Sequence, residues 1–424
     1  MNKNLPPGWE WARIDKVCNV VLGQSPPGSS YNQDGQGLPF FQGKAEFGDR
    51  YPVVRKWTTD PKKCAPSGSI LVSVRAPVGP TNITHVNCAI GRGLAALRPV
   101  KGTSTEYIFW AMRYSVANLA ERASGSTFEA ITGKQLRTHR LPVAPLAEQK
   151  RIVDAIEEHF SHLDAAEATL RLTLKRLDTL RSSILADAFH TNRKLPEGWK
   201  WAKLGDLCLP IQNINPRTIP NLQFKYIDIG GIDPNLGVVR YTKSLRGSGA
   251  PSRARQLVRS GDIVLSTVRT YQKKTAIVPS ELDGAIASTG FAVLRPAPSV
   301  NSWFIFYQVR ATNFVDSLNM MQTGTSYPAI RDNDVRSSFV RIAPAGEQER
   351  IVAYIEQRFS HLDALAAIAN VSLERISALR RSILAAAFSG RLVPQDPEDE
   401  PASILLERIA ASRAAEPARR RART

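Results

Sequence analysis

The chain has 424 residues, which is too long for one ordinary hydrophobic core, so we expect at least two domains. Its formal net charge of +18 indicates a polyanionic partner, and nucleic acid is the first candidate. The N-terminus has no apolar signal region and no apolar run reaches the length of a membrane span, so we expect a soluble protein of the cytoplasm. Four scattered cysteines without CxxC spacing and a few unclustered histidines predict free thiols and no metal site.

The chain repeats its opening. Residues 5–18 contain a Pro-Gly turn, two tryptophans and a short amphipathic stretch, and the same pattern returns at residues 195–208. A strand-like run after a Ser-Gly turn at residues 67–75 returns at residues 260–269. Matching pieces in the same order predict a tandem duplication of one α/β unit.

The repeat continues with an aromatic helix, YIFWAMR at residues 107–113 and FIFYQVR at residues 304–310. The segments between the repeated pieces, residues 19–66 and 209–259, differ in length and composition. A shared framework with dissimilar loops suggests two modules that do the same job on different targets. Free drift of unselected loops would leave the same pattern, and one sequence does not separate the two explanations.

Two long helices carry the strongest repeat. Residues 148–189 and 347–388 align without a gap, 24 of the 42 positions are identical, and neither copy contains proline or glycine. Apolar residues at two positions of a seven-residue pattern predict a seam, so the helices most simply pair with each other. The alternative is that each helix packs on its own globular domain. The predicted seam consists of Leu163, Leu170, Leu177, Leu180, Ile184, Leu362, Leu365, Ile376, Leu379 and Ile383.

The last part of the chain follows the second long helix. The acidic, proline-rich stretch QDPEDEP predicts a turn or linker, and residues 401–415 predict a short amphipathic helix that docks on the neighbouring helices. The expected organisation is a first globular domain at 1–147, a long helix at 148–192, a second globular domain at 193–346, a second long helix at 347–390 and a tail with a basic end at 391–424.

No motif in the sequence carries chemistry. Gly133-Lys134 lacks the glycine and hydroxyl residues of a phosphate-binding loop, and no glycine-rich turn indicates a dinucleotide or S-adenosylmethionine site. The FSHLD stretch of each long helix cannot form a catalytic relay, because adjacent helical residues point about 100° apart. We therefore expect a non-catalytic chain with no catalytic residues and no metal.

Binding to DNA is the remaining expectation. Arginine and lysine neutralise phosphate and read guanine, and asparagine and glutamine read adenine. Each candidate taken alone is equally compatible with a solvated surface role, so the set carries the prediction. The candidates in the first half are Gln24, Ser25, Tyr31, Gln42, Lys44, Arg75, Arg92, Ser126, Thr127 and Phe128, and those in the second half are Arg217, Arg253, Arg255, Arg269, Tyr271, Lys273, Lys274, Thr325, Ser326 and Tyr327.

Several motifs together resemble one known family. They are the GW opening of each half, GQSP at residues 23–26, the SGDI-type turn, the Gly-Ser/Thr-rich loop, the EQ-x-R-I-V helix start and SGRLVPQDPEDEPAS. In this combination the chain resembles the DNA-specificity (S) subunit of type I restriction–modification enzymes. One departure is IQNINP at residues 211–216, where the first half has LGQSP, so these two loops need not play equivalent roles.

The resemblance implies an α/β (α+β) fold with two target-recognition domains, related by pseudo-two-fold symmetry and separated by two long antiparallel paired helices. Each domain would read one half of a bipartite double-stranded DNA site, and the helices would set the gap. The implied partners are two modification and two restriction subunits. S-adenosylmethionine, ATP and Mg would be bound by those partners, with no cofactor on this chain. The alternative from another class is a coiled-coil scaffold with two protein-binding domains, whose basic charge serves acidic partners.

Overall fold

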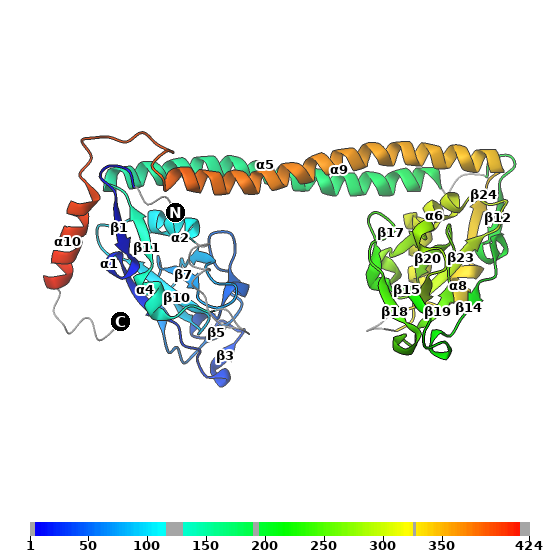
Figure 1. Cartoon of the computed structure of the whole chain (residues 1–424), viewed down its shortest axis with the longest axis horizontal. Helices are drawn as coiled ribbons and strands as arrows, with labels where there is room; N and C mark the ends of the chain where they lie inside the picture. Colours follow the sequence, from blue (N-terminus) through cyan, green and yellow to red (C-terminus); the bar gives the residue numbers. More distant parts are fainter. Residues whose placement is uncertain (1–4, 116–129, 190–194, 325–327, 416–424) are drawn as a thin grey trace. The chain divides into compact units, whose positions relative to one another are not determined.

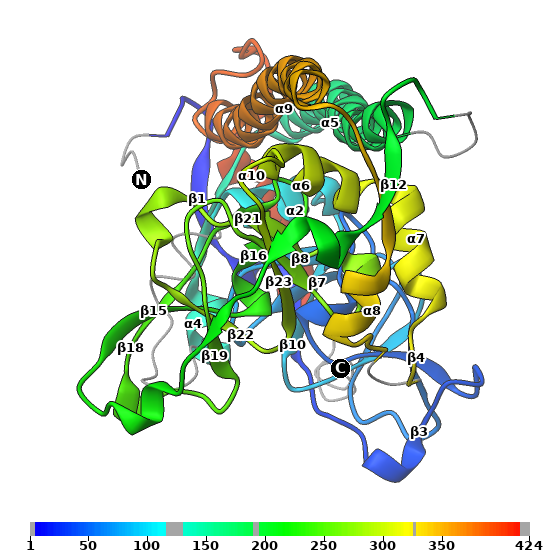
Figure 2. The same cartoon turned by 90° about the vertical axis from the view of Figure 1, so that its right-hand side faces the viewer.

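The computed structural model describes residues 5–115, 130–189, 195–324 and 328–415 (Figures 1 and 2). The chain divides into two compact units. Unit 1 comprises Met1–Ala168 together with Leu373–Thr424, and unit 2 comprises Thr169–Ser372. The division therefore falls inside both long helices. No helix within the described ranges is long and apolar enough to cross a membrane.

Unit 1 is built on two sheets and a short ribbon. An antiparallel sheet has the order β2 (Cys18–Leu22), β10 (Leu94–Pro99), β7 (Ile70–Ser73) and β8 (Thr81–Ile83). A mixed sheet has the order β3 (Tyr31–Asn32), β5 (Trp57–Thr58), β4 (Leu38–Phe41), β9 (Cys88–Ile90) and β6 (Cys64–Ala65), with β4 and β9 parallel. The ribbon pairs β1 (Glu10–Arg13) with β11 (Arg140–Val143). Helical elements are α1 (Ile14–Val17), η1 (Gly28–Ser30), η2 (Lys44–Glu46), α2 (Thr105–Tyr114) and α4 (Gly133–Thr138).

Unit 2 repeats this plan. Its antiparallel sheet has the order β13 (Cys208–Leu209), β23 (Phe291–Pro296), β20 (Ile263–Ser266) and β21 (Thr275–Ile277). Its mixed sheet has the order β14 (Gln212–Asn213), β19 (Ala254–Leu257), β22 (Ile286–Ser288), β15 (Gln223–Ile227) and β18 (Lys243–Arg246), with β15 and β22 parallel. Two ribbons pair β12 (Lys200–Lys203) with β24 (Phe339–Ile342) and β16 (Ile232–Asp233) with β17 (Val238–Val239). Helical elements are η3 (Leu204–Leu207), η4 (Pro216–Thr218), η5 (Ile229–Gly231), η6 (Gly247–Gly249), η7 (Thr270–Gln272), η8 (Ser280–Leu282), α6 (Ser302–Arg310), α7 (Thr312–Met320) and α8 (Asp332–Ser337).

The repeated motifs form the core of each unit. All four residues of β7, and all four of β20, are buried, which explains their uninterrupted apolar pattern. The aromatic helix begins at a polar cap in both units, since Ser104 Oγ accepts from the Tyr107 N–H and Asn301 Oδ1 accepts from the Phe304 N–H. Its aromatic residues then fill the space beside the antiparallel sheet.

The long helices are α5 (Leu146–Ala188) and α9 (Ala345–Ala387), with 43 residues each. They lie side by side and run antiparallel (Figure 1). Within unit 1, Arg380 of α9 pairs with Asp164 and Glu167 of α5 at 2.5 and 2.7 Å. Within unit 2, Arg181 of α5 pairs with Asp363 of α9. The predicted fold class, with mixed α/β units and two antiparallel paired helices, is confirmed.

The seam differs from the sequence prediction at one of its two heptad positions. Leu177, Leu362 and Ile376 are buried, and Leu163, Leu170, Ile184 and Ile383 are partly buried. Leu180, Leu365 and Leu379, which we expected in the seam, are 50%, 51% and 50% exposed. The buried and partly buried residues just named form a first row of side chains that faces the partner helix. A second row also faces it, and each of its members lies four residues after a position of the first row, where we expected three. The members of the second row are Phe160, Glu167, Leu174, Arg181, Ala188, Phe359, Ala366, Leu373, Arg380 and Ala387.

The second row could not be recognised from apolar spacing, because some of its residues are charged. Arg181 and Arg380 stand where a coiled-coil seam normally has apolar residues. Their stems lie in the interface while their guanidinium groups reach carboxylates of the facing helix. A prediction based on apolar residues alone therefore chose Leu180, Leu365 and Leu379, which are half-exposed.

The C-terminal segment completes unit 1. Helix α10 (Ala402–Ala415) buries Leu405 and Ile409 in the core that contains α1. Arg413 donates to the carbonyl oxygens of Asp15 and Lys16 at 2.6 and 2.9 Å. The helix predicted at residues 401–415 is present, and its buried side chains share one core with α1 and the start of α5.

Candidate nucleic-acid interface

In unit 1, four of the candidate residues gather where backbone segments approach closely. Ser25 follows β2, and its Oγ accepts a hydrogen bond of 3.3 Å from the backbone N–H of Arg92. Gln42 lies beside the same turn, because a Cβ added at Gly93 would stand 2.5 Å from the Gln42 carbonyl oxygen. Gln24 joins them by donating its backbone N–H to the last residue of β9 at 2.9 Å. Residues from three separate loops are therefore brought together.

The other described candidates of unit 1 lie on adjoining loops. The ring of Tyr31 stacks on Phe40 with 5.0 Å between centroids, and its hydroxyl donates to the Pro26 carbonyl at 2.9 Å. Lys44 is exposed at the start of η2, and Arg75 is exposed two residues after the end of β7. The phenol is thus engaged within the protein, whereas both cations are exposed.

In unit 2, three arginines surround η4 and η6. Arg217 donates through Nε to the Ala250 carbonyl at 2.8 Å, and Arg255 donates to the side chain of Asn215. Arg253 is exposed between them. These contacts fix two of the three guanidinium groups against neighbouring loop residues.

The second set of unit 2 candidates surrounds η7. Arg269 and Lys273 have φ of 50° and 51°, although neither is glycine. A left-handed conformation costs a non-glycine residue about 1 kcal/mol or more, and it persists only where the surroundings impose it. Here Thr270 Oγ1 is bonded to Asn319 Oδ1 at 2.6 Å, and Lys273 Nζ donates to Thr312 at 3.3 Å.

These contacts hold η7 in place and display one aromatic side chain. Tyr271 is 53% exposed at the middle of the turn. Lys274, three residues later, donates to the Ile229 carbonyl at 3.1 Å. An exposed tyrosine among basic residues on a fixed turn is suited to stacking on, or hydrogen bonding to, a nucleotide. The remaining candidates Ser126, Thr127, Phe128, Thr325, Ser326 and Tyr327 lie outside the described residues.

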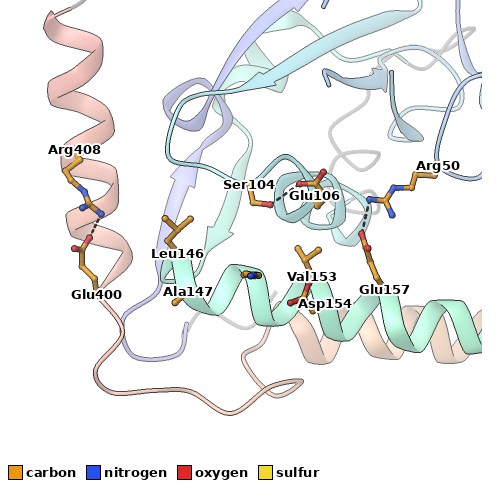
Figure 3. A pocket seen from close by; sticks show the side chains of 11 residues that line it. Arg50, Ser104, Glu106, Leu146, Ala147, Val153, Asp154, Glu157, Glu400 and Arg408 are labelled. Carbon is orange, nitrogen blue, oxygen red and sulfur yellow. Dashed lines mark hydrogen bonds and ion pairs between the residues drawn. The ribbon is translucent and has the colours of Figure 1, made fainter. Parts of the chain in front are cut away.

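A hollow of about 860 Å³ in unit 1 contains none of these candidates (Figure 3). Six of its polar lining residues are paired with one another: Arg50 lies 2.8 Å from Glu157, Ser104 donates to Glu106, and Arg408 pairs with Glu400. Within the described ranges, no three or more His, Cys, Asp or Glu side chains are grouped so as to hold a metal ion. Burial raises the pKa of the Cys18 thiol to about 12 and the pKa of the Cys208 thiol to about 11, so both stay protonated at neutral pH.

Two repeated contacts connect the globular part of each unit to its long helix, and sequence reasoning did not pair them. The indole N–H of Trp9 donates to Glu148 at 2.9 Å, and that of Trp199 donates to Glu347 at 2.9 Å. The following glutamine bonds back to the chain, Gln149 to Ala144 and, in unit 2, Gln348 to its equivalent carbonyl, both at 2.8 Å. These contacts could have been inferred from the sequence, because the Gly-Trp and Glu-Gln pairs that form them are both repeated in the second half.

Comparison with known proteins adds independent information. Residues 6–176 match the family model for the type I restriction modification DNA specificity domain. The putative type I restriction enzyme MjaX specificity subunit of Methanocaldococcus jannaschii is 40% identical over 156 residues, which cover 36% of this chain and 37% of that protein. The EcoDI specificity subunit of Escherichia coli is 22% identical over 97% of this chain and 96% of its own length. The EcoKI specificity subunit of Escherichia coli strain K12 is 23% identical over 97% of both chains.

Two solved structures share the fold. One, from a study of complex assembly and conformational transition of the type I R-M system, has a TM-score of 0.72 and 22% identity, and covers 92% of this chain and 99% of the other. The HsdS subunit from Thermoanaerobacter tengcongensis has a TM-score of 0.52, with the same identity and coverage. The first part of the chain thus matches the DNA specificity domain of type I restriction–modification enzymes, and nearly the whole chain is similar to specificity subunits of such enzymes.

Proposed function

We propose that this chain reads DNA for a type I restriction–modification complex, with each unit reading one half of a bipartite target. One observation carries the proposal. The two units share a repeated framework but carry loops that differ from one unit to the other. Exposed basic and amide side chains gather on those loops. Such groups supply phosphate contacts and base readout.

The proposal assigns no chemistry to the chain itself. S-adenosylmethionine would be bound by two modification subunits, and ATP and Mg by two restriction subunits, so methylation and cleavage would occur on those partners. The chain would work with them in the cytoplasm. Its contribution would be to choose the DNA site, for which its positive charge is suited.

The helix pair is proposed as the spacer between half-sites and as a docking post for partner subunits. Apolar side chains remain uncovered on it, and contiguous exposed apolar groups commonly mark protein contacts. Those in unit 2 are Leu172, Leu180, Leu365, Ile368 and Val371, each 47% exposed or more. They supply the apolar contact that assembly requires.

The test is an exchange of one recognition unit. Residues 1–147 are replaced by those of another specificity subunit, together with residues 391–424, because α10 packs on unit 1. Single-molecule methylome sequencing of cells expressing the chain with its partners should show a split motif, with one half changed by the exchange and the other retained.

Two outcomes would contradict the proposal. A change in both half-sites would show that the units do not read independently. An assembled complex that produces no split motif would remove DNA reading and favour an assembly scaffold.

A further inference from the structure

The dissimilar loops of each unit are attached to the repeated framework by an arginine at the end of its aromatic helix. Arg113 lies in the last turn of α2, and Arg310 ends α6. Neither residue belongs to the sets expected to contact DNA. Both come from the repeated motif, YIFWAMR in one half and FIFYQVR in the other.

In unit 1 the guanidinium of Arg113 donates to the backbone carbonyl of Asp49. It lies over the rings of Phe109 and Trp110, at 4.8 and 5.4 Å from their centroids. Asp49 belongs to residues 19–66, the segment that differs between the halves. The aromatic helix thus carries a cation that holds the backbone of the dissimilar segment.

Neighbouring contacts secure the same stretch. Asn82 of β8 donates to the Gly48 carbonyl at 2.9 Å and accepts the Gly48 N–H at 3.0 Å. The Ile83 N–H donates to the Arg50 carbonyl at 2.9 Å. Residues 48–50 therefore form a fixed base a few residues from Lys44 and Gln42.

In unit 2 Arg310 makes a more extensive set of bonds. It donates to the carbonyl oxygens of Pro234 and Asn235, both at 2.9 Å, and to the Thr275 carbonyl at 3.0 Å. It lies over Phe306 at 5.1 Å. Pro234 and Asn235 form the turn between β16 and β17, inside the dissimilar segment 209–259.

The environment of Arg310 requires these partners. Burial lowers the pKa of Arg310 to about 10, which still leaves it charged at neutral pH. Arg310 is partly buried, and a cation removed from water is costly unless it is hydrogen-bonded; the three carbonyl oxygens supply the bonds. A lysine has no planar fork with which to reach three acceptors while stacking on a ring.

We propose that Arg113 and Arg310 are positioning residues, each of which fixes the DNA-reading loops of its own unit on the repeated framework. Every residue offers a backbone carbonyl, whatever its side chain. An anchor that binds only carbonyl oxygens therefore tolerates changes of loop sequence, so one framework can present different reading surfaces. The reading role of those loops rests on the proposed function, whereas the anchoring does not.

The first experiment measures anchoring in the free full-length chain by hydrogen exchange and mass spectrometry. Arg310→Ala should speed exchange of residues 232–239 about tenfold or more, as expected for the loss of hydrogen bonds from a charged donor, and leave residues 46–53 unchanged. Arg113→Ala should do the reverse. Arg98→Lys and Arg259→Lys, at exposed positions in units 1 and 2, are the matched controls and should change neither segment. Unchanged exchange in both alanine variants would overturn the anchoring.

The second experiment measures target choice in the assembled complex, using methylation of the wild-type site and of sites with single base changes in either half. Arg310→Ala should weaken discrimination in one half only, and Arg113→Ala in the other half only. Arg310→Lys, which keeps the charge and the stem, should fall between wild type and Arg310→Ala, and it replaces the alanine variant if that fails to assemble.

Equal loss of discrimination in both halves, despite local exchange changes, would overturn the positioning role. A wild-type complex without a split motif would instead sink the proposed function and leave the anchoring result standing.

Discussion

The two tryptophan–glutamate pairs show how one contact acts differently in two copies. Glu148 is 2% exposed, whereas Glu347 is partly exposed. Both carboxylates accept an indole N–H at 2.9 Å. Because water can reach only the second, loss of the indole donor should matter more in unit 1.

Trp9→Phe should therefore destabilise unit 1 by about 1–3 kcal/mol beyond the loss of packing, the usual cost of an unsatisfied buried group. Trp199→Phe, the matched control, should cost unit 2 less. Hydrogen exchange in increasing urea reads the stability of each unit separately. Equal losses in the two units would contradict the role assigned to burial.

Glu148 also gives a pH dependence. Burial raises its pKa, although the Trp9 bond and Arg151 oppose the shift. Between the unfolded value of about 4.3 and the higher folded value, the folded state holds more protons, so stability falls as pH rises. Wild type should lose stability relative to Glu148→Gln as pH rises through this window, measured by hydrogen exchange of unit 1. A constant difference would refute the shift.

Lys273, the left-handed residue that follows η7, allows the effect of backbone strain to be measured apart from the effect of its charge. Lys273→Gly and Lys273→Ala both remove the ammonium group, so both should weaken DNA binding by the assembled complex equally and reduce its salt dependence. Only glycine relieves the backbone, so Lys273→Gly should be more stable than Lys273→Ala by about 1 kcal/mol. Equal stabilities in urea would show that the turn is not strained.

Single residues were only partly predictable from the sequence. The repeat aligns Arg75 with Arg269, but Arg75 pairs with Ala130 and the equivalent backbone pair in unit 2 is Val268 with Ala329. The turn after β20 is one residue longer than the turn after β7. The Ser73 N–H donates to the Pro80 carbonyl, seven residues on, whereas the Ser266 N–H donates to the Lys274 carbonyl, eight residues on. Strand pairing decides such a register, and composition alone does not reveal it.

At the scale of elements, prediction succeeded where one local property decides. The absence of proline and glycine predicted both long helices, and turn-bounded apolar runs predicted β7 and β20. The prediction of the seam was wrong at one heptad position, because the side chains that face the interface depend on the direction from which the partner helix approaches. Two arginines neutralised across the interface concealed that direction.

Leu177 and Leu180 test the corrected seam. Leu177→Ala should cost unit 2 about 2–3 kcal/mol, because Leu177 is buried, whereas Leu180→Ala should cost little. Chemical unfolding followed by hydrogen exchange of α5 measures both. A larger loss for Leu180→Ala would restore the seam read from apolar spacing.

At the scale of the whole molecule, unit 1 is assembled from both ends of the sequence. The repeat predicted two similar halves, but it did not show that α10 packs with the first of them. Arg151 pairs with Asp399 at 2.5 Å, and the Ala402 N–H donates to the Gly8 carbonyl at 2.8 Å. Such long-range contacts leave no periodic signal in the sequence.

Removal of residues 391–424 should therefore destabilise unit 1 and spare unit 2. The truncated chain loses the buried Leu405 and Ile409 and leaves the apolar surface of unit 1 uncovered. Limited proteolysis with mass spectrometry should show cleavage between residues 5 and 115 and protection of residues 200–320. Faster cleavage in unit 2 would contradict this assignment.

The same discontinuity sets an order of events during translation. A ribosome releases the first globular part long before residues 402–415 exist, so unit 1 waits without its last core helix until synthesis is nearly finished. Unit 2 is continuous in sequence and can close earlier, although it is made second. A nascent chain halted before residue 402 would expose the surface that α10 covers, which is the kind of apolar surface that chaperones and proteases recognise.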